Sequence, residues 1–132
     1  MQASSQPASV PGCIFCLPSA EEIVLQSEHF YSAFDKFPVN PGHLLIVSRR
    51  HVADFFDLRE VEAAELFRVL ASARTFLQTQ FRPDGYNIGI NCGEAAGQTV
   101  MHFHLHLIPR FAGDVENPRG GVRNLKNPLK PY

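Results

Sequence analysis

Histidine alternates strictly with large apolar residues between residues 102 and 107, and this alternation constrains the fold more than any other feature of the chain. Because side chains on a β-strand point to opposite faces with a period of two, the segment predicts a strand with two unlike faces. Its apolar side chains would enter a core, while its imidazoles would share the other face, roughly 7 Å apart in succession. The apolar residues are Phe103, Leu105 and Leu107, and the imidazoles belong to His102, His104 and His106.

A row of imidazoles on one face of a strand allows three interpretations. A solvated polar face would suit one histidine, but this face carries three of the six in the chain. Neighbouring histidines could converge on a Zn²⁺ ion, although the outer pair lies roughly 13 Å apart along the strand. We favour a catalytic row, in which one neutral imidazole attacks an electrophile and the others orient or assist it.

A loop of small residues leads into this strand. Residues 91–99 have the sequence NCGEAAGQT. The glycines permit tight turns, and successive backbone N–H groups in such turns can form an anion-binding concavity. Gln98 and Thr99 add side-chain donors at the end of the loop. Hydrogen-bond donors next to a nucleophile suit attack on a phosphoryl or acyl centre.

The sequence Gly97-Gln98-Thr99-Val100, followed by the three alternating histidines, resembles the histidine triad (HIT) family of nucleotide hydrolases and transferases. The resemblance runs from about Cys13 to Arg110 and includes an upstream Asp35 and the segment Pro41-Gly42-His43. Within the family, the chain is most similar to bacterial members that carry an N-terminal Cys-x-x-Cys.

The expected elements are short strands, then one long helix, then two strands, which predicts an α+β domain on an antiparallel sheet. The strands are expected at residues 23–26, 30–34, 43–48, 86–92 and 102–107. The resemblance implies a HIT-like antiparallel sheet of about five strands, covered by one long helix and a short one.

The long helix is expected to begin after Asp57, because Asp57 as N-cap and Glu60 three residues later form a capping-box pattern. Pro83 would end it. Apolar residues recur at steps of three and four and form one stripe: Ala63, Leu66, Phe67, Leu70, Ala73, Leu77 and Phe81. The charged residues Glu62, Glu65, Arg68 and Arg74 would face water, as would Arg49 and Arg50 at the end of the preceding strand.

Cys13 and Cys16 have the spacing of two ligands of a tetrahedral Zn²⁺ site. A buried cysteine pair or a redox pair would have the same spacing. The resemblance implies that His51 and His102 complete a closed Cys₂His₂ site, so the expected cofactor is a structural Zn²⁺.

The resemblance also assigns roles at the substrate site. It implies His104 as the nucleophile, with its second ring nitrogen bonded to the backbone carbonyl of His102, and Asp35 as the acceptor for ribose hydroxyls. The same Asp35 could simply open a turn, and the nearby aromatic residues could belong to the core. The implied catalytic residues are His102, His104, His106, Gln98 and Thr99, and the implied nucleotide-binding residues are Asp35, Asn91, Gly97, Phe15, Phe34 and His43.

The function that the resemblance implies is cleavage at the α-phosphate of a purine nucleotide conjugate, with adenosine expected as the nucleoside. The conjugate could be a dinucleoside polyphosphate or a nucleoside phosphoramidate, and the intermediate would be a covalent nucleotidyl-His104. A non-catalytic nucleotide-binding module and a zinc metallohydrolase that uses the histidine row as ligands are the alternatives.

Length and charge set the remaining expectations. The chain of 132 residues suits one domain, over residues 13–112, between an N-terminal tail (1–12) and a C-terminal tail (113–132) that either stays solvated or lies over an active site. A net charge of −1 gives no basis for nucleic-acid binding. No apolar run could span a membrane and no signal peptide is visible, so the cytoplasm is expected. The resemblance implies a homodimer.

Overall fold

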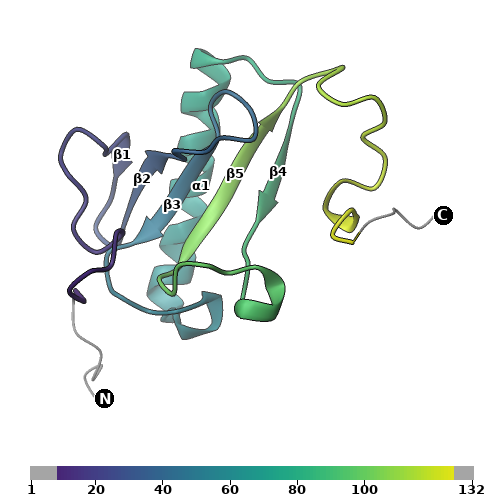
Figure 1. The fold of residues 1–132 in the computed structure, drawn as a ribbon. Coiled ribbons are helices and arrows are strands. Elements are labelled where there is room, and N and C mark those ends of the chain that lie inside the picture. The colour runs from purple at the N-terminus through teal and green to yellow at the C-terminus, as the bar shows by residue number, and fades with distance from the viewer. Residues whose placement is uncertain (1–8, 127–132) are drawn as a thin grey trace.

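Five strands form one sheet in the spatial order β1-β2-β3-β5-β4, and every pairing is antiparallel (Figure 1). The structure, a computed structural model, describes residues 9–126. The strands are β1 (Leu25–Gln26), β2 (Phe30–Phe34), β3 (Leu44–Ser48), β4 (Gly85–Gly89) and β5 (His104–Arg110). The helix α1 (Glu60–Gln80) lies against the sheet. The predicted α+β fold is confirmed.

Short helical segments in the described part of the chain are 3₁₀ turns rather than a second α-helix. They are η1 (Phe55–Asp57), η2 (Glu94–Ala96) and η3 (Gly121–Arg123). The first precedes α1, the second lies in the loop before β5, and the third lies in the C-terminal segment.

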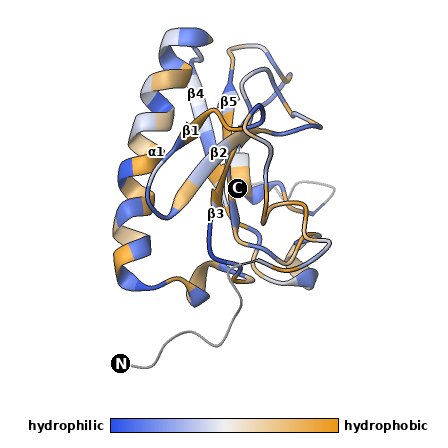
Figure 2. Ribbon diagram, turned by 90° about the vertical axis from the view of Figure 1, so that its left-hand side faces the viewer, coloured by the Kyte–Doolittle hydropathy of each residue, from blue (hydrophilic) through white to orange (hydrophobic). Residues whose placement is uncertain are grey.

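The central strand β3 separates two apolar clusters, because all five of its residues are buried and successive ones point to opposite faces. Leu44 and Ile46 pack in the main core, which includes residues of α1 and, as predicted, Phe103, Leu105 and Leu107. Leu45 and Val47 belong to a second cluster with Tyr31, on the other face. In Figure 2, α1 lies to one side of the sheet. Hydrophobic and hydrophilic residues alternate along the helix.

The predicted start of the long helix is wrong, because the N-cap is Arg59 and not Asp57. Asp57 is the last residue of η1, and its carboxylate accepts from the backbone N–H of Asp54. Asp54 in turn accepts from Phe56, so the capping box belongs to the 3₁₀ turn. The helix proper begins at Glu60, and Glu62 accepts from the backbone N–H of Arg59.

Two acidic residues of α1 that were expected to face water are buried. Glu62 is 0% exposed and receives two hydrogen bonds from the guanidinium of Arg50, at 2.8 and 3.1 Å. Glu65 is 7% exposed and accepts from the backbone N–H and the ring of His29, both at 2.7 Å. Each carboxylate has a donor on a distant segment, which a helical-wheel argument on α1 alone could not reveal.

The apolar stripe of α1 is also shifted from its predicted position. Leu66, Ala73 and Leu77 are buried as expected, but Phe67 is 73% exposed and Val69 takes a core position. The buried residues of α1 keep steps of three and four, but the buried face includes Glu62 and Glu65, whose partners on other segments turn the helix toward them.

Gly42 sits where the chain turns into β3. Its φ is +88°, in the left-handed region, and a Cβ atom there would lie 3.0–3.1 Å from Phe81 and Pro109. Only glycine fits this turn without strain. After this turn the ring of His43 lies next to that of His106 on β5, with the ring centroids 5.2 Å apart.

The described ends of the chain lie apart from the sheet's centre. Residues 113–126 run beside β4 (Figure 1), and η3 contacts that strand. The predicted tails at residues 1–12 and 113–132 fall partly outside the described residues, at 1–8 and 127–132. In the described range, no helix has the length and apolar character needed to cross a bilayer.

Candidate active site and metal centre

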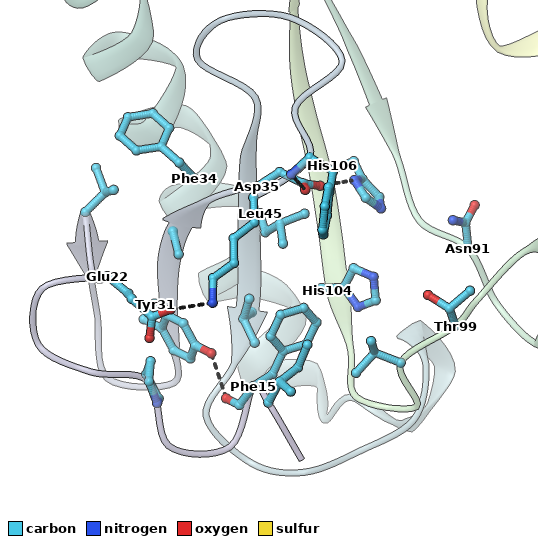
Figure 3. A pocket seen from close by; sticks show the side chains of 18 of the residues that line it. Phe15, Glu22, Tyr31, Phe34, Asp35, Leu45, Asn91, Thr99, His104 and His106 are labelled. Carbon is cyan, nitrogen blue, oxygen red and sulfur yellow. Dashed lines mark hydrogen bonds and ion pairs between the residues drawn. The ribbon is translucent and has the colours of Figure 1, made fainter. Parts of the chain in front are cut away.

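A cavity of about 680 Å³ opens on the sheet face opposite α1 (Figure 3). Leu45, Val47 and Tyr31 of the second apolar cluster form its floor. Of the predicted site residues, those that line it are Phe15, Phe34, Asp35, Asn91, Gly97, Thr99, His104 and His106. The structure therefore brings together most of the residues implied for catalysis and nucleotide binding. Gln98, His43 and His102 lie outside this lining.

His104 presents a free ring nitrogen to the cavity. Its Nδ1 lies 2.8 Å from the backbone carbonyl of His102, and a carbonyl can only accept, so Nδ1 carries the proton. The other nitrogen, Nε2, must then hold a lone pair in the neutral ring. This is the tautomer that an attacking imidazole requires. The ring lies between Phe15 on one side and Thr99 and Asn91 on the other (Figure 3).

His106 has the opposite tautomer, and a chain of hydrogen bonds determines it. The backbone N–H of Val39 donates to His43 Nδ1 at 3.0 Å, so the proton of His43 must sit on Nε2. That Nε2 lies 2.9 Å from His106 Nδ1, to which it donates. His106 therefore carries its own proton on Nε2 and acts as a hydrogen-bond donor in the cavity.

Burial keeps the rings of His106 and His43 neutral. Desolvation, with smaller contributions from His104 and His43, lowers the pKa of His106 to about 4, although Asp35 opposes the shift. Burial also lowers the pKa of His43, against the same opposing carboxylate. At neutral pH, His43 and His106 are therefore uncharged, and each carries its single ring proton on Nε2.

Asp35 opens a turn, one of the two roles that the sequence left open, and it also lines the cavity. Its Oδ1 accepts from the backbone N–H of Phe37 at 2.8 Å, which makes an Asx turn at the end of β2. Its Oδ2 lies 3.4 Å from His43 Nε2 and 3.9 Å from His106 Nδ1. The carboxylate also lines the cavity, where it can accept hydrogen bonds from a ligand.

Gln98 organises the loop before β5 instead of facing the cavity. It is 3% exposed, and its Oε1 accepts from the backbone N–H of Gly93 at 2.8 Å. Its Nε2 donates to the carbonyls of Ala53 and Val100, at 2.6 and 3.2 Å. The side-chain amide thus has backbone partners on both atoms, while neighbouring Thr99 lines the cavity.

The two predicted aromatic residues have different surroundings. Phe15 packs against His104, with ring centroids 5.0 Å apart. Phe34 is 42% exposed and also contacts Phe76 and Phe81, so it is part of the cavity wall and of the packing around α1.

Sequence reasoning missed two features of the cavity. The Tyr31 hydroxyl donates to the carbonyl of Phe15 at 2.6 Å, and Lys36 pairs with Glu22 at 3.2 Å at the cavity's edge. The alternation of β2 could have placed Tyr31 on the cavity face, once its pairing with Val47 of β3 was known. No sequence signal identifies the partners of Lys36.

The four predicted metal ligands meet at one point. Cys13, Cys16, His51 and His102 offer ligand atoms that all lie within 4.8 Å of one another. The Cys13–His102, Cys16–His51 and Cys16–His102 sulfur-to-nitrogen distances are 3.4, 3.2 and 3.5 Å, and the two Nδ1 atoms are 3.1 Å apart. A tetrahedron with Zn–N of about 2.0 Å and Zn–S of about 2.3 Å has edges of about 3.3–3.8 Å. The cluster therefore fits a zinc ion closely.

The tautomer of His102 supports this fit. Its Nε2 donates to the carbonyl of Ser48 at 2.6 Å, so the lone pair lies on Nδ1, which points at the cysteine sulfurs. Burial lowers the pKa of His102, although the bond to Ser48 opposes that shift. Burial also raises the pKa of Cys16. The ring is thus neutral and correctly oriented for a metal.

The comparisons with known proteins agree on one family. The family model described as HIT domain matches residues 18–113. The chain is 37% identical over 93 residues to an AP-4-A phosphorylase of Mycobacterium tuberculosis, covering 70% of this chain and 48% of that protein. It is 36% identical over 92 residues to a bis(5'-adenosyl)-triphosphatase of Saccharomyces cerevisiae, covering 69% and 45%. The chain thus spans about half the length of these two relatives.

Solved structures share the fold. A HIT family protein from Bacillus anthracis has a TM-score of 0.72 at 36% identity, covering 80% of this chain and 78% of that one. A zinc-bound histidine triad family protein from Mycobacterium smegmatis has a TM-score of 0.70 at 33% identity, covering 78% of each chain.

Proposed function

Because the chain belongs to the HIT family, we propose that it cleaves the α-phosphate bond of an adenosine nucleotide conjugate through a covalent nucleotidyl-His104 intermediate. The observation that carries this proposal is the tautomer of His104, whose Nδ1–H is held by the His102 carbonyl while its free Nε2 belongs to a ring that lines the cavity. The names of the two relatives support a dinucleoside polyphosphate as substrate. A nucleoside phosphoramidate offers the same reactive phosphorus.

The reaction proceeds in two displacements. Nε2 of His104 attacks the α-phosphorus, the bond to the leaving group breaks, and that group departs with its electron pair and takes up a proton. Water, or phosphate in a phosphorylase, then attacks the phosphorus and releases the nucleotide, which restores neutral His104. The His102 carbonyl stabilises the positive charge that the ring carries in the intermediate.

Hydrogen-bond donors around His104 stabilise the phosphoryl oxygens. Thr99, Asn91 and the loop backbone offer such donors, and His106 adds its Nε2–H. Removal of one donor of this kind costs about 2.7–4 kcal/mol of transition-state stabilisation in other enzymes. His43 and Gln98 act one step further away, since His43 fixes the tautomer of His106 and Gln98 fixes the loop. Asp35 accepts ribose hydroxyls at the end of β2.

A zinc ion fits the Cys₂His₂ cluster as a structural crosslink between three segments of the chain, and it takes no part in the displacement at His104. The geometry disfavours the alternative of a metallohydrolase. Within the described residues, His102 and His106 belong to two different candidate clusters, so the triad does not converge on one ion. The zinc-bound M. smegmatis relative supports the presence of zinc.

We also propose a homodimer that forms through β4 and α1. β4 is an edge strand with only β5 beside it in the described sheet, and its Ile88 is 49% exposed. Phe67 of α1 adds exposed apolar surface, 73% accessible. Such an edge readily pairs with a second chain. The cytoplasmic location expected from the sequence stays a prediction.

The test is a product assay on diadenosine tetraphosphate, diadenosine triphosphate and an adenosine phosphoramidate, with denaturing quench to trap the intermediate. We expect AMP-His104 on the protein and AMP or ADP as a product. His104→Ala should reduce turnover at least 10⁴-fold, roughly the loss seen when other enzymes lose a nucleophile.

The control is AMP affinity, which His104→Ala should change less than about threefold, because the ring is one of many cavity groups. His104→Gly should regain part of the activity with added imidazole. Full activity in His104→Ala, or AMP binding without turnover of any of the three substrates by the unaltered chain, would contradict the proposed mechanism.

A further inference from the structure

Both residues between the two cysteines line the nucleotide cavity. Ile14 and Phe15 stand on its wall, and the centroid of the Phe15 ring lies 5.0 Å from that of His104 and 6.0 Å from that of His102. Figure 3 shows Phe15 beside His104. The loop that offers two metal ligands is therefore also a surface of the substrate site. One short segment joins the two sites.

This loop, residues 11–22, makes no strand pairing with the sheet. Residues 11–22 form turns, so no ladder of strand hydrogen bonds fixes them. The Tyr31 hydroxyl anchors the loop through the carbonyl of Phe15. At Cys13 and Cys16 the contacts with the rest of the chain run through sulfur: Cys13 reaches His102, and Cys16 reaches His51 and His102. The Phe15 ring also packs against the rings of His104 and His102, and Glu22 pairs with Lys36.

We propose that a metal ion held by the cluster of Cys13, Cys16, His51 and His102 positions Phe15 and Ile14, and so sets nucleotide affinity without altering the chemistry at His104. The inference rests on the proposed nucleotide site. With the ion bound, the wall is ordered before the nucleotide arrives. Without the ion, nucleotide binding must order the loop. Each loop residue that becomes ordered lowers the nucleotide affinity by about five- to thirtyfold.

The sheet and the His102 carbonyl hold the nucleophile, although Phe15 packs against its ring. His104 belongs to β5, where its backbone pairs with Val47 of β3, and its ring is oriented by the carbonyl of His102. The donors of the loop at 91–99 approach from the other side of the ring (Figure 3). Metal occupancy should therefore act on binding through Phe15 and leave the attacking nitrogen in place.

The experiment is calorimetric measurement of AMP affinity for the full chain, loaded with one zinc ion or stripped by a chelator. AMP is a product and is not consumed. We expect stripping to weaken AMP binding at least tenfold in the unaltered chain. In Phe15→Ala, stripping should change affinity less than threefold, because the residue that transmits the effect is gone. Phe56→Ala, a phenylalanine that is 81% exposed and outside the cavity lining, should behave like the unaltered chain.

Two further readouts identify the cause. Far-ultraviolet circular dichroism should show that the stripped protein keeps its sheet, and hydrogen exchange should accelerate at residues 13–16 while β5 stays protected. Equal AMP affinity with and without zinc, an equal loss in Phe15→Ala, failure to bind zinc, or unfolding on stripping would each overturn the inference. No AMP binding by the zinc-loaded chain would instead contradict the proposed function.

Discussion

At the scale of single residues, partners rather than positions decide what each histidine of the triad does. A backbone carbonyl holds the proton of His104 on Nδ1 and frees Nε2. A neighbouring donor, His43, holds the proton of His106 on Nε2. A third partner, the Ser48 carbonyl, turns the lone pair of His102 toward the cysteines. One residue type thus provides a ring with an unprotonated Nε2, a hydrogen-bond donor and a ring whose lone pair faces two cysteines.

The buried neutral histidines predict how stability depends on pH. The pKa of His106 is about 4 in the folded chain and about 6.5 when the chain unfolds, so the unfolded state binds more protons between these values. The free energy of unfolding should therefore fall as pH drops from 6.5 toward 4 and should change little above 6.5. His43 contributes in the same direction, since burial lowers its pKa too.

Urea denaturation between pH 7.5 and 4.5, with a chelator present so that metal loss does not contribute, measures this dependence. His106→Gln should flatten the decline because the variant side chain does not titrate. A free energy of unfolding that stays constant from pH 7 to 4.5 in the unaltered chain would show that the rings are not buried in the neutral form.

At the scale of elements, α1 is attached to the sheet by buried carboxylates as well as by its apolar stripe. Glu62 binds Arg50, which follows β3, and Glu65 binds Ser27 and His29 between β1 and β2. Burial alone would raise the pKa of Glu65, but the hydrogen bonds from Ser27 and His29 lower it to about 2. The same balance, with Arg50 as donor, lowers the pKa of Glu62.

Removal of one partner of the Glu62 pair should be costly. Arg50→Ala leaves a carboxylate that is 0% exposed without its cation, and we expect the free energy of unfolding to fall by about 3 kcal/mol. The double variant Arg50→Ala with Glu62→Leu should regain part of the loss, because it leaves no charge buried. Chemical denaturation measures both.

Arg68→Ala is the matched control for that series, since Arg68 is exposed on the same helix. It should change the free energy of unfolding by less than about 0.5 kcal/mol. A loss as large as that of Arg50→Ala would mean that the effect comes from the change in net charge and not from the buried pair.

At the scale of the whole molecule, the sheet assembles a site from segments that lie far apart in the sequence. The loop at 13–16, the end of β2, the start of β3, the loop at 91–99 and β5 all meet on the face opposite α1. The edge strand β4 carries the exposed Ile88, which the proposed dimer would cover.

The dimer predicts that a charge on β4 produces a monomer. Ile88→Lys places an ammonium group at a position that is 49% exposed in the single chain and buried in the proposed interface. Sedimentation velocity should show about twice the chain mass for the unaltered protein and the chain mass for the variant. Val39→Lys, at an exposed residue of the loop between β2 and β3, should leave the dimer intact. A monomer in the unaltered chain would end the proposal.

The sequence by itself determined the fold class, the histidine strand with its apolar face, and the family motif. These are local or periodic properties: alternation at 102–107 indicates which side chains share a face, and Gly97-Gln98-Thr99 stands next to the histidines along the chain. The predicted bounds of that strand were wrong, because β5 begins at His104 and leaves His102 and Phe103 just before it. It also indicated the four metal ligands through the resemblance to the family, and the structure brings them together.

Only the tertiary structure decided which polar groups are buried and what each one bonds. The sequence predicted that Glu62 and Glu65 face solvent and that Gln98 faces phosphate. In the structure each of these side chains bonds to a partner 5 to 45 positions away along the chain, which the sequence does not reveal. The histidine tautomers likewise follow from backbone groups such as those of Val39 and Ser48. A polar side chain takes its role from the donor or acceptor that folding places beside it, and sequence spacing does not encode that neighbour.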